Sequence, residues 1–283
     1  MDRAGCKKWI LWIVPFLLYV GLIYHMPLME PDEGRYSLIP STMNRTGDYV
    51  TPHLKEVVYI EKPPLAYWAT AAAFKIFGEN AFASRLFTAL CAWGCILLCW
   101  RVGRYFHDEK TGLYAAAVLT MCLFHLAIGR INILDMPLAL FVCLAVWSGF
   151  RYFSDKERDR KRLWLFYLFC GFAFLTKGLI GIVFPGAILV IWLLVSRRWR
   201  DPFRLVSPVG IAIFLAVTLP WLVLIQRANP DFFWFFFIQE HFLRYTTTMH
   251  HRNETVFYFI PVLVAGVIPW LGYFAQAGRG IRG

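Results

Sequence analysis

Charged residues are scarce in this 283-residue chain, because Asp, Glu, Lys and Arg together make up only 17% of it. Soluble proteins average roughly 25% charged and 45–50% apolar residues, whereas 59% of this chain is hydrophobic and its mean hydropathy is +0.53. A soluble fold of this composition would expose apolar patches large enough to aggregate, so much of the surface must face lipid. Disorder is also excluded, since 26 Phe, 13 Tyr and 12 Trp do not stay solvated.

The chain also lacks the cysteine pattern of a disulfide scaffold and any internal repeat. Six of its seven cysteines lie inside apolar runs with no His or Asp partner nearby, which excludes a disulfide framework. They are Cys91, Cys95, Cys99, Cys122, Cys143 and Cys170. Without a repeat, the inverted-repeat signature of many secondary transporters is absent.

About eight apolar segments are long enough to cross the roughly 30 Å hydrocarbon layer of a membrane. They cover residues 9–26, 81–100, 113–129, 133–153, 163–176, 179–196, 203–226 and 256–275, with a short break at Lys177-Gly178. The first segment lacks a small-residue cleavage site, which favours a retained anchor over a signal peptide. The sequence therefore predicts an all-α, polytopic transmembrane helix bundle.

The positive charge is placed unevenly along the chain. With the N-terminus in the cytoplasm, the predicted spans leave five cytoplasmic segments: 1–8, 101–112, 151–162, 197–204 and 276–283. These hold 18 of the 29 Lys and Arg residues but only 7 of the 18 Asp and Glu residues, so the whole net charge of +11 lies on one side. This asymmetry follows the positive-inside rule. The charge therefore reflects membrane topology, and nucleic-acid binding is not expected.

Two long segments are predicted on the outer side, namely a first outer loop over residues 27–80 and a second over residues 227–254. The first is expected to carry interfacial helices, and the aromatic half of the second predicts an amphipathic helix at headgroup depth. Under this topology Asp32, Lys62, Asp135, Lys177 and His241 all emerge on the outer side.

Several of these charges also have a reading without catalytic function. Glu61 and Lys62 can be exposed charges of a turn before a helix that begins at Pro63-Pro64. Asp32 or Glu33 can complement the dipole at a helix start. Asp135 can pair with Arg130, because a carboxylate so close to hydrocarbon is costly unless it is paired or faces water. Lys177 can extend its ammonium towards the interface.

Six short motifs follow one another along the chain: Asp32-Glu33-Gly34-Arg35-Tyr36, Gly47-Asp48-Tyr49-Val50-Thr51-Pro52, Glu61-Lys62-Pro63-Pro64-Leu65, Arg130 with Leu134-Asp135-Met136-Pro137-Leu138, Leu175-Thr176-Lys177-Gly178, and Glu240-His241-Phe242. In this order they resemble the motifs of the GT-C membrane glycosyltransferases of family 39. The similarity is greatest to the bacterial aminoarabinose lipid A transferases, which are related to the protein O-mannosyltransferases.

The resemblance implies transfer of a sugar from a polyprenyl-phosphate donor to lipid A or a protein. The site would lie on the periplasmic face of a bacterial inner membrane. Asp32 matches the catalytic carboxylate of the family, and Asp135 matches its second acidic residue. Positions that line the donor-phosphate cavity are matched by Arg35, Tyr36, Tyr59, Lys62 and Lys177. Cations there would stabilise the leaving phosphate, and a carboxylate would deprotonate a hydroxyl acceptor or stabilise positive charge on the sugar.

The same resemblance implies a divalent metal, zinc, held by Glu61 and His241, with a direct hydrogen bond between these two side chains as the alternative. Family members are about twice as long, so residues 1–283 are expected to form the transmembrane catalytic region without the C-terminal part of the family. Two other functions stay open: a transporter or flippase for the same lipid, and a truncated, non-catalytic membrane subunit.

Overall fold

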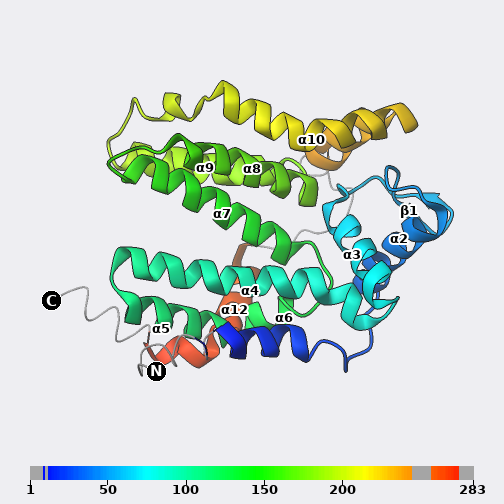
Figure 1. The fold of residues 1–283 in the computed structure, drawn as a ribbon, viewed down its shortest axis with the longest axis horizontal. Helices are drawn as coiled ribbons and strands as arrows, with labels where there is room; N and C mark the ends of the chain where they lie inside the picture. The colour runs from blue at the N-terminus through cyan, green and yellow to red at the C-terminus, as the bar shows by residue number, and fades with distance from the viewer. Residues whose placement is uncertain (1–8, 10–11, 244–255, 274–283) are drawn as a thin grey trace.

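The computed structural model describes residues 9, 12–243 and 256–273, and nearly all regular structure in them is helical. Six helices run side by side along the long axis of the molecule (Figure 1). They are α4 (Ala81–Phe106), α5 (Glu109–Thr120), α7 (Asp135–Ser154), α8 (Arg160–Lys177), α9 (Ile180–Val195) and α10 (Pro208–Ala228). Helix α7 packs on α8, α4 on α5 and α10 on α8, so the predicted all-α class is confirmed.

Three of the described helices, α4, α7 and α10, are long and apolar enough to cross a membrane. Shorter apolar helices cover Trp12–Gly21, α3 (Leu65–Phe77) and α9. The last predicted span is divided into η4 (Val256–Tyr258), α12 (Phe259–Gly266) and η5 (Ile268–Trp270). An apolar helical membrane fold is therefore present, and the number of eight spans stays a prediction.

The third predicted span is broken in the structure into α5 and α6 (Leu123–Ile128). The break follows Thr120, whose backbone carbonyl accepts a hydrogen bond from the Tyr19 hydroxyl at 3.2 Å. A side chain from the first apolar helix thus satisfies a carbonyl that the end of α5 leaves without an intrahelical partner. Because this partner is remote in sequence, the apolar run alone does not reveal the break.

The predicted break at Lys177-Gly178 is confirmed. Helix α8 ends at Lys177, and Gly178 follows with φ 85° before α9 begins at Ile180. Only glycine adopts this backbone region without steric cost. The chain therefore reverses direction at this point, and the Lys177 side chain stands at the end of α8.

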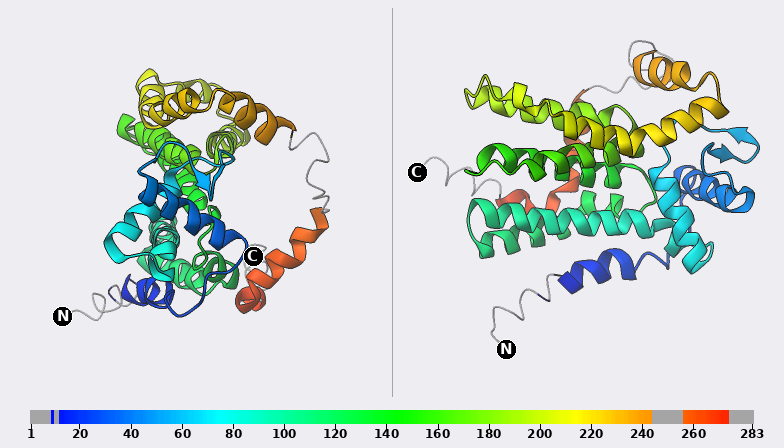
Figure 2. Two further views of the ribbon diagram at one scale, coloured as in Figure 1. Left: turned by 90° about the vertical axis from the view of Figure 1, so that its right-hand side faces the viewer. Right: turned by 45° about the horizontal axis from the view of Figure 1, so that its top comes forward.

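The first outer loop forms a cap over one end of the bundle. It consists of α2 (Asp32–Thr46), a hairpin of β1 (His53–Leu54) and β2 (Val57–Val58), and α3, all gathered beyond the ends of the long helices (Figures 1 and 2). The strands are antiparallel, with His53 opposite Val58 and Leu54 opposite Val57. The helices expected in this loop are thus present.

The cap is attached to the bundle through the turn that follows α2. The Asp48 carboxylate accepts hydrogen bonds from the backbone N–H groups of Val50 and Thr51 at 2.9 and 3.0 Å. The carbonyl of Val50 accepts the indole N–H of Trp221, on α10, at 3.1 Å. The second motif of the sequence therefore has a structural role, because it joins the cap to α10.

The segment predicted as the second outer loop contains the helix expected there, η3 (Trp234–Leu243). Phe232 and Phe236 are fully buried against Trp221 of α10, whereas Phe233 and Trp234 are exposed. The aromatic run is thus amphipathic, with one face packed on the bundle. The rest of the predicted segment, up to residue 254, lies outside the described residues.

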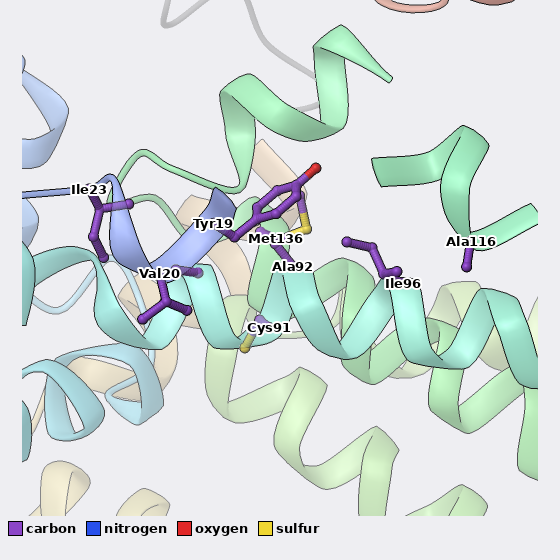
Figure 3. Packing of buried hydrophobic residues seen from close by; sticks show 9 residues of the cluster. Tyr19, Val20, Ile23, Cys91, Ala92, Ile96, Ala116 and Met136 are labelled. Atoms are coloured by element: carbon purple, nitrogen blue, oxygen red, sulfur yellow. The ribbon is translucent and has the colours of Figure 1, made fainter. Parts of the chain in front are cut away.

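One apolar core joins the first helix to α4 and α7. Tyr19, Val20 and Ile23 pack with Cys91, Ala92 and Ile96 of α4, Ala116 of α5 and Met136 of α7 (Figure 3). Met136 follows Asp135 directly, so this core fixes the start of α7. Small residues such as Ala92 allow the helices to approach closely, as in other membrane bundles.

A buried ion pair closes the same region at the end of the bundle that carries the cap. The Arg85 guanidinium donates to both Glu33 carboxylate oxygens at 2.7 Å, and the two side chains are 2% and 0% exposed. Arg85 also donates to the backbone carbonyls of Ile23, Met26 and Pro27. Although burial raises the pKa of Glu33, its hydrogen bonds with Arg85 and with backbone N–H groups lower it overall.

Replacing Arg85 with Met is expected to reduce the free energy of unfolding by about 3–5 kcal/mol, because the Glu33 carboxylate would stay buried without its partner. Thermal unfolding of the detergent-solubilised chain measures the loss. Arg101→Met is the matched control, since Arg101 lies on the same helix and is exposed. Equal melting temperatures for the two variants would contradict a structural role for the pair.

Candidate functional site

The candidate site lies where the cap meets the ends of the long helices. Residues Ile60 and Leu65, on either side of Lys62, pack against the buried cluster that includes Phe174 and Leu175 at the end of α8, and α3 contacts α8. The segment between β2 and α3 therefore lies next to the end of the helix that carries Lys177.

The Tyr59 hydroxyl links a cation to a carboxylate at the entrance to α3. It accepts a hydrogen bond from Arg35 Nη1 at 3.2 Å and donates one to Glu61 Oε2 at 3.0 Å. Burial and the Glu61 charge raise the pKa of Tyr59 to about 12, although Arg35 acts in the opposite direction. Tyr59 is therefore protonated at neutral pH and fixes Arg35 and Glu61 relative to each other.

Tyr36 connects the two predicted acidic residues. Its ring stacks on Tyr67 with centroids 6.0 Å apart and planes inclined by 26°. Burial raises the pKa of Tyr36, and the charges of Asp32 and Asp135 both add to this rise. The backbone carbonyl of Tyr36 accepts a hydrogen bond from Asn132 Nδ2 at 3.3 Å, so the first turns of α2 lie next to the segment that precedes α7.

Asp32 and Glu33 differ sharply although they are neighbours. The Asp32 side chain is 59% exposed, and its nearest cation is Arg35 at 4.0 Å, whereas Glu33 is enclosed by its pair with Arg85. Only Asp32 is accessible to a substrate. Sequence reasoning placed Glu33 at a helix start, which is correct, and missed that it carries the buried ion pair.

Lys177 and Asp135 form an ion pair between the end of α8 and the first turn of α7, with Nζ and Oδ1 2.5 Å apart. Both side chains are partly exposed, so the pair adds little to stability. Each charge complements the dipole of its own helix. The alternative pairing of Asp135 with Arg130 does not occur, because Arg130 donates to the backbone carbonyl of Leu22 at 3.0 Å.

Lys62 pairs with Glu240, a residue that sequence reasoning did not select. Lys62 Nζ lies 3.4 Å from Glu240 Oε2, and the side chains are 15% and 8% exposed. The contact joins the first outer loop to η3 across 178 positions in the sequence. The one available signal was its place in the motif Glu240-His241-Phe242, directly before a selected residue.

The predicted metal pair is described only in part. Glu61 lies in the site, hydrogen-bonded to Tyr59, whereas the His241 side chain lies outside the described residues. Within the described part of the chain, no group of three or more His, Cys, Asp or Glu residues could hold a metal ion.

Comparison with known proteins places this arrangement among membrane glycosyltransferases. The model of the dolichyl-phosphate-mannose-protein mannosyltransferase family matches residues 61–224. An undecaprenyl phosphate-alpha-4-amino-4-deoxy-L-arabinose arabinosyl transferase of Pseudomonas fluorescens strain Pf0-1 is 33% identical over 94% of the chain and 50% of its own length. A Proteus mirabilis transferase of the same name is 32% identical over 95% of the chain and 50% of its length. The chain thus spans about half the length of the curated relatives it matches.

Solved structures give the same result. ArnT from Cupriavidus metallidurans bound to undecaprenyl phosphate superimposes with a TM-score of 0.90 and 30% identity over 100% of this chain and 52% of that chain. The Saccharomyces cerevisiae protein O-mannosyltransferase Pmt1-Pmt2 complex bound to the sugar donor matches with a TM-score of 0.51 and 20% identity, over 85% of this chain and 34% of that chain. The second match concerns the fold alone.

Proposed function

Because the chain belongs to the dolichyl-phosphate-mannose-protein mannosyltransferase family, we propose that it takes part in transferring a sugar from a polyprenyl-phosphate donor to a membrane acceptor. The main support is its match, over the whole chain, to a transferase structure that holds undecaprenyl phosphate. The names of the relatives favour 4-amino-4-deoxy-L-arabinose as the sugar. Lipid A is the acceptor that the motif resemblance implies, and a protein is the alternative.

In the proposed reaction, the bond between the sugar anomeric carbon and a phosphate oxygen breaks as an acceptor oxygen bonds to the same carbon. The electron pair of the broken bond stays on the leaving phosphate. A hydroxyl acceptor loses its proton to a carboxylate, whereas a phosphate acceptor needs no base. Positive charge develops on the sugar, and negative charge develops on the phosphate.

Some site residues act on the acceptor or on the positive charge of the sugar, and others act on the negative charge of the phosphate. Asp32 is the exposed carboxylate that acts on the acceptor or on the sugar, and Asp135 is the second acidic residue beside Tyr36. Arg35, Lys62 and Lys177 bind the donor phosphate, because cations are the groups that stabilise a leaving phosphate. Tyr36 and Tyr59 line the same space, and Tyr59 orients Arg35.

Asp32→Asn is expected to lower the rate of sugar transfer roughly 10²–10³-fold, since a carboxylate that acts only in the transition state is lost. Transfer from undecaprenyl-phosphate aminoarabinose to lipid A in proteoliposomes measures the rate. Glu30→Gln is the control, because Glu30 is exposed two positions earlier in the sequence. If Asp32→Asn turns over at the wild-type rate, Asp32 is not catalytic.

The proposed membrane orientation puts the cap and η3 on the periplasmic side, the N-terminus in the cytoplasm and about eight spans between them. The support is the concentration of positive charge in segments such as 101–112 and 151–162. The proposed site lies at the end of the bundle opposite to these positively charged segments.

A single cysteine at Glu56, at the exposed hairpin tip, is expected to react with an impermeant maleimide in whole spheroplasts, whereas one at Lys156 is not. Both are placed in a chain without native cysteines. Lysed spheroplasts give the control, because both positions then become accessible. Labelling of position 156 in intact spheroplasts would contradict this orientation.

A metal bound by Glu61 and His241 belongs to the same proposal. The Lys62–Glu240 contact supports it, since it brings the residues that adjoin Glu61 and His241 in the sequence within 3.4 Å of each other. A carboxylate oxygen and an imidazole nitrogen are ligands that zinc accepts, with water or a substrate oxygen in the open positions. When bound, the ion would stabilise negative charge on the phosphate.

Purified chain is expected to retain zinc after dialysis, and His241→Ala to lose it, because one of only two protein ligands is removed. Metal analysis by mass spectrometry measures the content. His107→Ala serves as the matched variant, since His107 lies at the end of α4 and is exposed. Equal zinc contents in the parent and in His241→Ala would contradict the metal site. The alternative, a direct hydrogen bond between Glu61 and His241, would then be the interpretation that stands.

A further inference from the structure

Each of the three cations that the proposed function assigns to the donor phosphate has a carboxylate of its own. Arg35 Nη2 lies 4.0 Å from Asp32, Lys62 Nζ lies 3.4 Å from Glu240, and Lys177 Nζ lies 2.5 Å from Asp135. A site built for the strongest binding of a phosphate would leave its cations free for the anion. Here much of their charge is already balanced by fixed carboxylates.

Glu240 is the most enclosed of these carboxylates. Its side chain is 8% exposed, and that of Lys62 is 15% exposed, so water and salt screen this pair less than the other two. The residue belongs to η3, which is packed on α10 through Phe232, Phe236 and Trp221. The Glu240 charge is therefore held beside Lys62.

The donor and the product of the proposed reaction differ in charge at the group that these cations bind. A polyprenyl-phosphate sugar is a phosphodiester with one negative charge. The polyprenyl phosphate that remains after transfer is a monoester with a second pKa near 6, and so it carries nearly two negative charges at neutral pH. The energy between a ligand and a fixed charge scales with the ligand charge, so a fixed carboxylate penalises the product about twice as much as the donor.

We propose that Glu240, with Asp135 in the same role at Lys177, lowers the affinity of the phosphate site for the dianionic product lipid more than its affinity for the monoanionic donor lipid. This inference rests on the proposed function and adds to it a means of releasing the product. Glu240 is thus a specificity-determining residue that acts through the charge it places beside Lys62. A metal at Glu61 and His241 would by the same scaling favour the dianion more than the monoanion, so the zinc content of each variant is measured together with its dissociation constants.

The test compares two lipids that differ in one charge: undecaprenyl phosphate and its methyl phosphodiester. Dissociation constants are measured at pH 8 for the purified full chain in micelles by microscale thermophoresis. Glu240→Gln, which keeps the size of the side chain and removes its charge, is expected to tighten the diester about tenfold and the monoester roughly a hundredfold. The factor by which the dissociation constant of the monoester falls should approach the square of the factor for the diester.

Glu79→Gln provides the matched control, because the Glu79 carboxylate is exposed and accepts the Ser41 hydroxyl at 2.9 Å. Neither dissociation constant should change in this variant. Asp135→Asn is the second variant, which keeps the inference testable if Glu240→Gln does not fold. It should shift the two dissociation constants in the same ratio. Weaker binding of both lipids, or equal tightening of both, would overturn the inference. A wild-type chain that binds neither lipid would instead contradict the proposed function, and the inference would fall with it.

Discussion

The buried pair between Glu33 and Arg85 is the interaction on which the geometry of the site depends. Arg85 on α4 holds the carbonyls that follow the first helix, and Glu33 accepts the backbone N–H of Asn132 at 2.8 Å. Glu33 adjoins Asp32, and Asn132 lies three residues before Asp135. One ion pair therefore fixes the two accessible carboxylates relative to each other. Its burial makes the arrangement rigid, because breaking it would leave a charge in an apolar surrounding.

Local features of the sequence predicted much of the fold and part of the site. The break in the apolar run at Lys177-Gly178 indicated where a helix ends, and the structure has Gly178 there with φ 85°. Asp135 before Pro137 indicated a helix start, and α7 begins at that residue. The long apolar runs gave α4, α7 and α10 to within a few residues. These features depend on neighbours in the chain, so a single sequence contains them.

Contacts between distant segments could not be predicted in this way. The pairing of Glu240 with Lys62 and the break after Thr120 both depend on partners more than a hundred positions away. The interpretation of Glu33 had the same limitation, since its partner is Arg85. In each case a group remote in the sequence determines the contact, and only Glu33 had been assigned a role from its local surroundings. The resemblance of the motifs supplied the site residues that spacing alone does not bring together.

A structure of the full chain with bound undecaprenyl phosphate tests the central claim most directly, because the claim concerns where the phosphate lies. The account predicts the phosphate within hydrogen-bond distance of both Lys62 Nζ and Lys177 Nζ, with the Asp32 carboxylate facing the same space. A phosphate bound at the opposite end of the bundle, for example among the arginines at 197–204, would contradict it.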